Sequence, residues 1–286
     1  MAVWVIQVLN GVSYGMLLFL LAAGLTLTFG LLRIVNLTHG SFYLLGGYIA
    51  LAVVAATDNF LLGVLASAVS MGLLGMLIQR SLLSRYVGKE LAQVMLTFGC
   101  LLLLGDVALW GFGGQPQTIP IPAIFQGSVR VLGGGFPMYR FVLIAAGLIS
   151  GVFLWWFHDH TRLGTIVRAA VNDPEIARAL GVQVPLVITA VFGLGAALAG
   201  AAGAIGGPIV GMYPGADLDT LILAIVVVVV GGLGSLRGAF LAALLVGLLD
   251  TFGRTLFPEM SQFAIFAPMA LVLIVRPAGL LGRVSP

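Results

Sequence analysis

The sequence is poor in charge: only 8% of its 286 residues are Asp, Glu, Lys or Arg, and the first 32 residues carry none. Soluble domains carry about 25% charged residues, whereas 60% of this chain is hydrophobic and its mean hydropathy is +1.16. This composition excludes a soluble globular protein. It predicts one all-α, polytopic membrane domain over residues 1–286. Because the N-terminus lacks a basic n-region, we expect a retained first span rather than a cleaved signal peptide.

Cysteine and lysine each occur once, as Cys100 and Lys89. A single cysteine excludes an internal disulfide and indicates no compartment. The P-loop motif GxxxxGK[ST] is absent, because Glu90 follows Lys89 and Leu83 occupies the position of the first glycine. We therefore expect no nucleotide to bind this chain. The absence of a basic run with interleaved aromatic residues argues against a nucleic-acid surface.

The sequence offers little support for a catalytic or metal site. The run His158-Asp159-His160 ends an apolar segment without further ligands at a metal-binding spacing, so we interpret it as an interfacial polar cluster. His39 and Ser41 are near neighbours with poor spacing for a nucleophile–base dyad on a helix, and no G-x-S-x-G elbow is present. We predict no catalytic residue and no metal ligand.

Charge-poor segments predict about 8–10 transmembrane helices, some of them broken or short. Nine segments are recognised: Trp4–Leu31, Ser41–Ala56, Phe60–Gln79, Leu91–Phe112, Phe141–Phe157, Leu186–Ile205, Leu221–Val230, Ala239–Leu249 and Ser261–Val275. Three of them (the second, seventh and eighth) are short for a complete span. The stretch Gly113–Pro137 is rich in proline and glycine and predicts a loop.

The distribution of basic residues predicts the orientation, because Lys and Arg accumulate on the cytoplasmic side. Alternating the nine segments places ten basic residues on one side and three on the other. The ten are Arg33, Arg80, Arg85, Lys89, Arg162, Arg168, Arg178, Arg237, Arg276 and Arg283; the three are Arg130, Arg140 and Arg254. The N-terminus is therefore expected outside, and the C-terminus and the loop Thr161–Gly181 in the cytoplasm.

The loop Thr161–Gly181 is a polar segment between two apolar ones, and its middle predicts a short helix, Pro174–Leu180. Asp173 is a good N-cap, Pro174 suits the first helical position, and Glu175 is favoured near the positive end of the helix dipole. Arg178 falls in the last turn, and Gly181 suits the left-handed residue that ends a helix. A helix this short is marginal alone in water. Ile176 and Leu180 are four residues apart and share one face, so docking against another surface and an ordinary connecting turn are both open.

Two interrupted pairs of apolar segments lie near the two ends of the chain, as the halves of a repeat would. The first interruption is Leu32–Gly40 and the second is Gly231–Gly238. Irregular backbone persists at membrane depth only beside protein or water, so such pairs indicate a transport path. The alternative is that both are turns between complete helices. The residues predicted to line the path are Asn36, His39, Gly40, Gly231, Gly232 and Gly234.

Two carboxylates lie within or at the edge of predicted spans, and intramembrane carboxylates are candidates for function. Asp250 has Arg254 four residues later, so we expect an ion pair on one helix face. Asp106 has no such local partner. It is expected to serve helix packing or to line a polar path.

Several stretches resemble one family, the LivH-type permeases of branched-chain amino acid ABC importers. The similar stretches are GLTLTFGLLRIVNLTHGSFYLLGGYIA (24–50), TRLGTIVRAAVNDPEIARALGV (161–182), FGLGAALAGAAGAIGGPI (192–209), VVVVVGGLGSLRGAFLAALLVGLLD (226–250) and RPAGLLGR (276–283). They follow the family order and span nearly the whole chain.

The resemblance implies a multi-pass inner-membrane subunit that forms the translocation path with a second, related permease. Two cytoplasmic ATPases would hold the ATP and Mg²⁺, an extracytoplasmic binding protein would deliver the substrate, and this chain would bind no cofactor. Substrates of such systems include branched-chain amino acids, urea, short amides and aromatic acids. The coupling helix that contacts an ATPase would be Pro174–Leu180, with Asp173, Glu175, Ile176, Ala177, Arg178 and Gly181 in or beside it. A different class of protein, a self-sufficient secondary transporter or channel, is the alternative.

Overall fold

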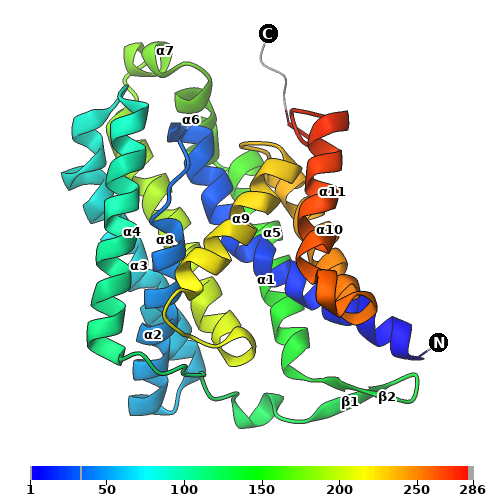
Figure 1. Ribbon diagram of the computed structural model, residues 1–286. Coiled ribbons are helices and arrows are strands. Elements are labelled where there is room, and N and C mark those ends of the chain that lie inside the picture. The colour runs from blue at the N-terminus through cyan, green and yellow to red at the C-terminus, as the bar shows by residue number, and fades with distance from the viewer. Residues whose placement is uncertain (1, 33, 283–286) are drawn as a thin grey trace.

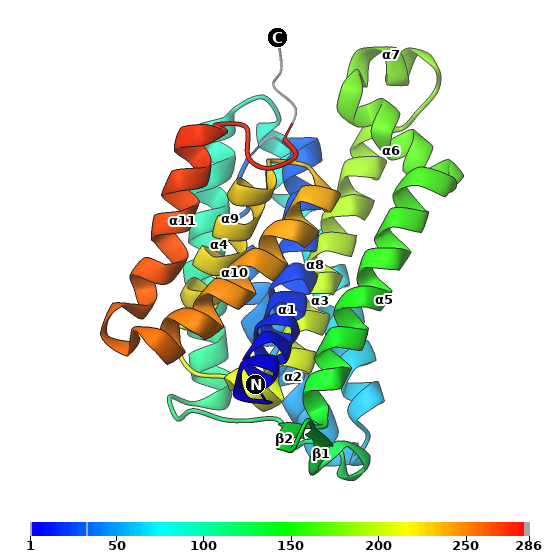
Figure 2. The same cartoon turned by 90° about the vertical axis from the view of Figure 1, so that its right-hand side faces the viewer.

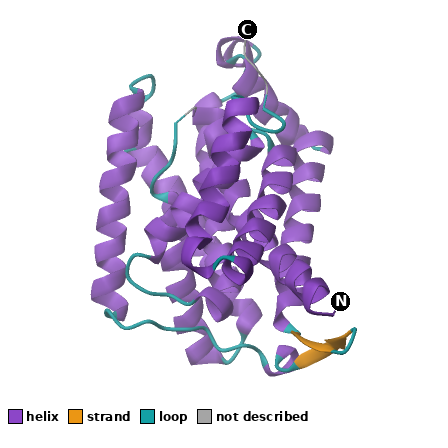
Figure 3. Cartoon of the chain, turned by 45° about the vertical axis from the view of Figure 1, so that its right-hand side comes forward, coloured by secondary structure: helices purple, strands orange, loops and turns teal. Residues whose placement is uncertain are grey.

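The computed structural model describes residues 2–32 and 34–282, and it is a bundle of helices with one small hairpin (Figures 1 and 3). Arg33 and Arg283, two of the residues used to predict the orientation, lie outside the described residues. The helices are α1 (Ala2–Leu32), α2 (His39–Thr57), α3 (Phe60–Ser81), α4 (Glu90–Phe112), α5 (Tyr139–His160), α6 (Arg162–Asn172), α7 (Pro174–Ala179), α8 (Val184–Val210), α9 (Ala216–Gly231), α10 (Leu236–Leu256) and α11 (Ser261–Val275). Three short 3₁₀ helices are η1 (Leu83–Tyr86), η2 (Ala123–Phe125) and η3 (Pro258–Met260).

Among the described residues, seven helices are long and apolar enough to cross a membrane: α1, α2, α3, α4, α5, α8 and α10. The prediction of an all-α polytopic bundle is therefore confirmed. Helices α9 and α11 have 16 and 15 residues, or about 24 and 22 Å at ~1.5 Å per residue, less than the ~30 Å of a bilayer core. The predicted short segment Ala239–Leu249 is wrong in length, because it lies inside the 21-residue α10.

The loop predicted at Gly113–Pro137 contains a two-stranded antiparallel hairpin, β1 (Ser128–Val131) and β2 (Gly134–Pro137). Between the strands, Leu132 and Gly133 both have positive φ, at 48° and 89°. Two such residues form the tight turn whose twist matches that of the strands. The hairpin was not predicted, because its strands of four residues are too short to give an alternating pattern.

Figures 1 and 2 place the hairpin and the N-terminal end of α1 at one end of the bundle. Helices α6 and α7 and the last turns of α11 lie at the opposite end. The basic loops around α6 and α7, η1 and the start of α10 thus share one end, as the alternation of spans predicts. Which end faces the cytoplasm stays a prediction from charge.

Backbone-to-backbone contacts between glycines bring the central helices together. Helices α2 and α8 meet where a Cβ on Gly46 would clash with the Gly200 Cα atom. On its other side Gly200 faces α3, where a Cβ would clash with Met71, and Ser67 donates a hydrogen bond to the Gly200 carbonyl at 2.7 Å. Gly15 and Gly247 bring α1 and α10 together in the same way. Small residues drive helix association in lipid because they permit close approach. This packing accounts for many of the chain's 40 glycines.

Candidate functional site

The loop between α5 and α8 forms a compact helical hairpin rather than an extended connection. Thr161 begins α6, its hydroxyl oxygen accepting from the Gly164 amide at 2.9 Å. Asp173 begins α7, its carboxylate accepting from the amides of Glu175 and Ile176 at 3.0 and 2.9 Å. The predicted cap and the predicted proline at the helix start are therefore confirmed.

Helix α7 ends one residue earlier than predicted, at Ala179, with Leu180 as its C-cap and Gly181 at φ +86°. Helix α6 was not predicted. Its first residues, Arg162-Leu163-Gly164-Thr165, combine a charge and a glycine with few apolar residues, and that pattern resembles a loop. A capping Thr161 three residues before Gly164 was the available signal.

One side of α7 packs on its neighbours and the other is open. Ala177 is buried against Ala170 of α6 and Val184 of α8. By contrast, the side chains of Ile176 and Leu180 are 60% and 78% exposed, beside exposed charges at Glu175 and Arg178. Apolar side chains beside charges at the tip of a projecting loop form a surface suited to a protein partner. We call this set of four exposed residues the α7 surface.

The polar run at the end of α5 is tied to α10 by an ion pair. Asp159 accepts from the Arg237 guanidinium at 3.0 Å and contacts the His158 ring at 2.8 Å. Over residues 2–32 and 34–282, no group of three His, Cys, Asp or Glu side chains is placed to hold a metal ion.

The first predicted interruption is a break in the bundle interior. After α1 the chain is not helical from Ile34 to Thr38. Helix α2 then begins at His39, and its first two residues, His39 and Gly40, are buried. Asn36 accepts from the Thr38 amide at 3.1 Å, and the Thr38 hydroxyl donates to the Thr97 carbonyl of α4 at 2.9 Å. These contacts hold part of the irregular segment within the protein, as membrane depth requires, whereas Asn36 Nδ2 and His39 Nδ1 are buried without a hydrogen-bond partner among the described residues.

Contacts with α4 give the depth of this break. The Ser41 hydroxyl, in the first turn of α2, donates to the Leu101 carbonyl at 3.2 Å. Leu101 lies 11 residues after the start of α4 at Glu90, about 16 Å along a helix of about 34 Å. Helix α2 therefore begins near the middle of the bundle rather than at its surface.

A second break at similar depth precedes α9, and sequence reasoning missed it. The segment Gly211–Gly215 has positive φ at both terminal glycines, 79° and 95°, and α9 starts at Ala216. Its second residue, Asp217, lies against Gly40 so closely that a Cβ on Gly40 would clash with the Asp217 carbonyl oxygen. The signal was the run Gly-Met-Tyr-Pro-Gly-Ala-Asp, a turn followed by an acidic first helical turn.

The second predicted interruption lies elsewhere. Gly231 and Gly232 are buried at the far end of α9, where the Leu280 and Leu281 amides donate to the Val230 and Gly231 carbonyls. Gly234 is exposed beside Gly30 at the end of α1. From Asp217 to Gly231 is 14 residues of helix, or about 21 Å. The structure thus brings Gly40, which shares the first break with Asn36 and His39, against Asp217. It does not bring Gly231, Gly232 and Gly234 to them.

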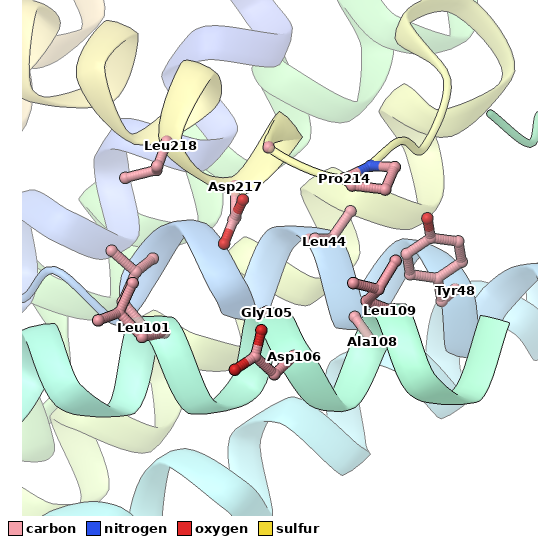
Figure 4. A pocket seen from close by; sticks show the side chains of 12 residues that line it. Leu44, Tyr48, Leu101, Gly105, Asp106, Ala108, Leu109, Pro214, Asp217 and Leu218 are labelled. Carbon is pink, nitrogen blue, oxygen red and sulfur yellow. The ribbon is translucent and has the colours of Figure 1, made fainter. Parts of the chain in front are cut away.

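Between α2, α4 and α9 lies a cavity of about 190 Å³, which we call the α2–α4–α9 cavity. Figure 4 shows Asp106 of α4 and Asp217 of α9 among its lining side chains. Leucines contribute much of the remaining wall: Leu44, Leu101, Leu102, Leu109 and Leu218. Asp106 was singled out from the sequence, and the structure places it on a cavity. Asp250, in contrast, accepts from Arg254 Nε through both carboxylate oxygens at 2.8 and 2.9 Å, as predicted.

A polytopic helical bundle in which interrupted helices meet at membrane depth, with a helical hairpin projecting from one end, is the architecture of a membrane transport permease. The chain belongs to the family described as branched-chain amino acid transport system / permease component, which matches residues 7–273. This confirms the resemblance to LivH-type permeases, and it makes the chain a multi-pass inner-membrane protein.

Curated relatives align over almost the full chain. The high-affinity branched-chain amino acid transport system permease protein BraD of Pseudomonas aeruginosa is 30% identical, covering 97% of this chain and 95% of BraD. LivH of Salmonella typhimurium, also named a high-affinity branched-chain amino acid transport system permease protein, is 27% identical. The alignment covers 97% of this chain and 95% of LivH. LivM from the same organism is 28% identical, covering 95% of this chain and 69% of LivM.

Among solved structures, the chain is similar to one described as PsaBC from Streptococcus pneumoniae in complex with Fab. The TM-score is 0.52 at 13% identity, covering 93% of this chain and 89% of that chain. At this identity the likeness shows the fold alone.

Proposed function

We propose that this chain is the permease subunit of an ATP-driven importer for branched-chain amino acids or a related small substrate. It pairs with a second, related permease, and the two form the translocation path. The relatives named LivH and LivM support this pairing, because both kinds of permease align with this chain along most of its length.

In this proposal the energy comes from two partner ATPases, which hold the ATP and Mg²⁺, and an extracytoplasmic binding protein delivers the substrate. The absence of a P-loop around Lys89 supports a chain that hydrolyses no ATP and binds no cofactor itself. The α7 surface supports the docking of an ATPase. Its two apolar side chains would pack in a groove, and Glu175 and Arg178 would fix the orientation by polar contacts.

The observation that carries the proposal is the α7 surface itself: a capped helix, held by a buried alanine, presents exposed Ile176 and Leu180 at the tip of the loop. Burying such side chains at an interface gains about 1.5–3 kcal/mol each. This gain offsets the marginal stability of a six-residue helix.

Reversing both charges on the α7 surface, Glu175→Arg with Arg178→Glu, tests the proposal in the reconstituted complex. We expect the substrate-stimulated ATP hydrolysis to fall at least about tenfold, since a like-charge contact costs about 1.4 kcal/mol or more. The matched control swaps two exposed charges in another loop of the same end, Lys89→Glu with Glu90→Lys, and keeps its stimulation. If substrate-stimulated ATP hydrolysis is unchanged in the charge-reversed α7 variant, the proposal that α7 docks on an ATPase is refuted.

A further inference from the structure

The two carboxylates on the α2–α4–α9 cavity differ in burial but share one property. The residue Asp217 is only 6% exposed, whereas Asp106 lies on the exposed side of α4. Among the hydrogen bonds and ion pairs of the described residues, neither carboxylate has a side-chain partner; Asp217 meets only backbone amides of its own turn. Both differ in this from Asp250, which Arg254 neutralises.

Asp217 points across the gap from α9 toward α4 (Figure 4). A Cβ built on Gly105 would lie 3.2 Å from its Oδ2 atom, so the carboxylate stands directly over the α4 backbone at that glycine. Gly105 lies 15 residues into α4, about 22 Å along it. Asp106 follows it in the sequence and lines the same cavity. The two acids therefore line one cavity at membrane depth, although 111 positions separate them in the chain.

Carboxylates at this depth are costly unless something pairs with them, and they mark substrate or ion pathways. No basic side chain of the described residues lines the cavity. A cationic group that enters the cavity would supply the partner that the wall itself does not provide. A strongly hydrated metal ion would find few oxygen ligands here, because most of the wall is apolar.

The rest of the cavity fits a small amphipathic ligand. The leucine side chains offer an apolar wall, and Tyr48, whose ring is stacked on Phe112 at 4.5 Å, adds an aromatic group to it. At about 190 Å³ the cavity is below the range of drug-sized sites, which favours a ligand of few atoms. An ammonium group on an aliphatic carbon skeleton matches both parts of the wall.

We propose that Asp217 and Asp106 form a transient binding site for the ammonium group of an amino-acid substrate, with the leucines of the cavity receiving its aliphatic side chain. This assignment rests on the proposed function and goes further, because it places a substrate contact within the permease itself. The mouth of the cavity lies on the exposed side of α4 and α9, at Leu102, Leu109 and Leu218. A second permease covering that side would complete the enclosure.

The charge of the cavity can be measured without transport, by labelling a cysteine at its mouth. In a Cys100→Ala background, Leu102→Cys is treated with a cationic aminoethyl and an anionic sulfonatoethyl methanethiosulfonate. Because Leu102 lines the same cavity as the two carboxylates, their field at an effective dielectric constant of ~20 predicts that the cationic reagent reacts at least about tenfold faster. An exposed loop position, Ile124→Cys, supplies the reference ratio of the two rates.

Adding Asp217→Asn and Asp106→Asn to the Leu102→Cys protein should bring its ratio to within about twofold of that reference. A ratio at Leu102→Cys that already equals the reference, or one that the two substitutions leave unchanged, overturns the proposal. Asp106 is exposed, so its single substitution is expected to fold even if Asp217→Asn does not.

Transport in the complete importer gives the second test. Asp217→Asn should lower amino-acid uptake per ATP hydrolysed about tenfold, while Asp217→Glu retains part of it. The matched control is Asp219→Asn, a change in the same helical turn. The Asp219 carboxylate accepts a hydrogen bond from the Tyr213 hydroxyl at 2.9 Å and does not line the cavity. Equal uptake per ATP in Asp217→Asn and the wild type refutes the site.

The two proposals fail in different ways. If the wild-type complex shows no uptake coupled to ATP hydrolysis, the proposed function fails, and the labelling ratios still decide whether the cavity attracts cations. If uptake is coupled and the ratios show no preference, only the ammonium site fails.

Discussion

The contact between the starts of α2 and α9 leaves no space for a side chain at Gly40, and replacing this glycine tests the packing. A Cβ at position 40 would overlap the carbonyl oxygen of Asp217 and lie 3.0 Å from the Leu221 Cβ. The overlapping atom belongs to the backbone, so no rotamer change relieves the clash. Helix α9 must move away from α2, or the first turn of α2 must open.

The magnitude follows from two opposing terms. Alanine in place of glycine in a helix gains roughly 0.5–1 kcal/mol, because the unfolded chain loses freedom. Overpacking a tight site costs about 1–3 kcal/mol. We expect Gly40→Ala to lower the free energy of unfolding by about 1–2 kcal/mol. The control is Gly99→Ala in the middle of α4, where a Cβ would have no atom within 4 Å. This variant should raise the free energy of unfolding by roughly 0.5–1 kcal/mol, because it has the helical gain without the clash.

Equilibrium unfolding of the purified protein in mixed micelles, followed by far-UV circular dichroism as SDS is titrated, measures both variants. The predicted separation between them is about 2 kcal/mol. If Gly40→Ala and Gly99→Ala change the free energy of unfolding equally, the close contact between α2 and α9 is not a constraint on the fold. Amino-acid uptake by Gly40→Ala should also fall, since the same displacement moves Asp217.

Two further predictions concern the end of the bundle that carries α7. Asp173→Ala should destabilise α7 by about 1 kcal/mol and speed its amide hydrogen exchange about fivefold, whereas Asp173→Asn keeps the cap and the wild-type rate; equal protection in all three proteins would contradict the capping role. The pair Asp159–Arg237 should show a coupling energy below about 1 kcal/mol in a double-mutant cycle, because the Arg237 side chain is 74% exposed. A coupling above about 2 kcal/mol would show instead that the pair holds α5 to α10.

The sequence predicted the positions of the helices well, because charge-poor runs bounded by polar residues are strong local signals. It also predicted α7 to within one residue, since the cap Asp173, the first-turn Pro174 and the terminal Gly181 act locally. Helix lengths were underestimated. The predicted Ala239–Leu249 stopped at charged or polar neighbours, but α10 continues through Asp250 and Arg254, which neutralise each other on one helical face.

Depth in the bundle could not be obtained from the sequence. Hydropathy describes composition along the chain, whereas the starts of α2 and α9 are placed by contacts with α4 and with each other. The break before α9 is also hidden by its apolar neighbours Met212 and Tyr213. The cavity was out of reach for the same reason, because Asp106 and Asp217 become neighbours only after α4 and α9 pack.

The attachment of α7 has a mechanical consequence. The amide of Val182 donates to the Ala177 carbonyl at 3.0 Å, and Ala177 packs on Val184, so α7 and the first turn of α8 form one stiff unit. Helix α8 then continues for 27 residues, a rod of about 40 Å, and ends at Val210, directly before the Gly211–Gly215 break. A displacement of the exposed α7 surface is therefore passed to the start of α8. At the other end of α8, Gly206-Gly207-Pro208 is the point where the helix can bend, directly before the segment that positions Asp217.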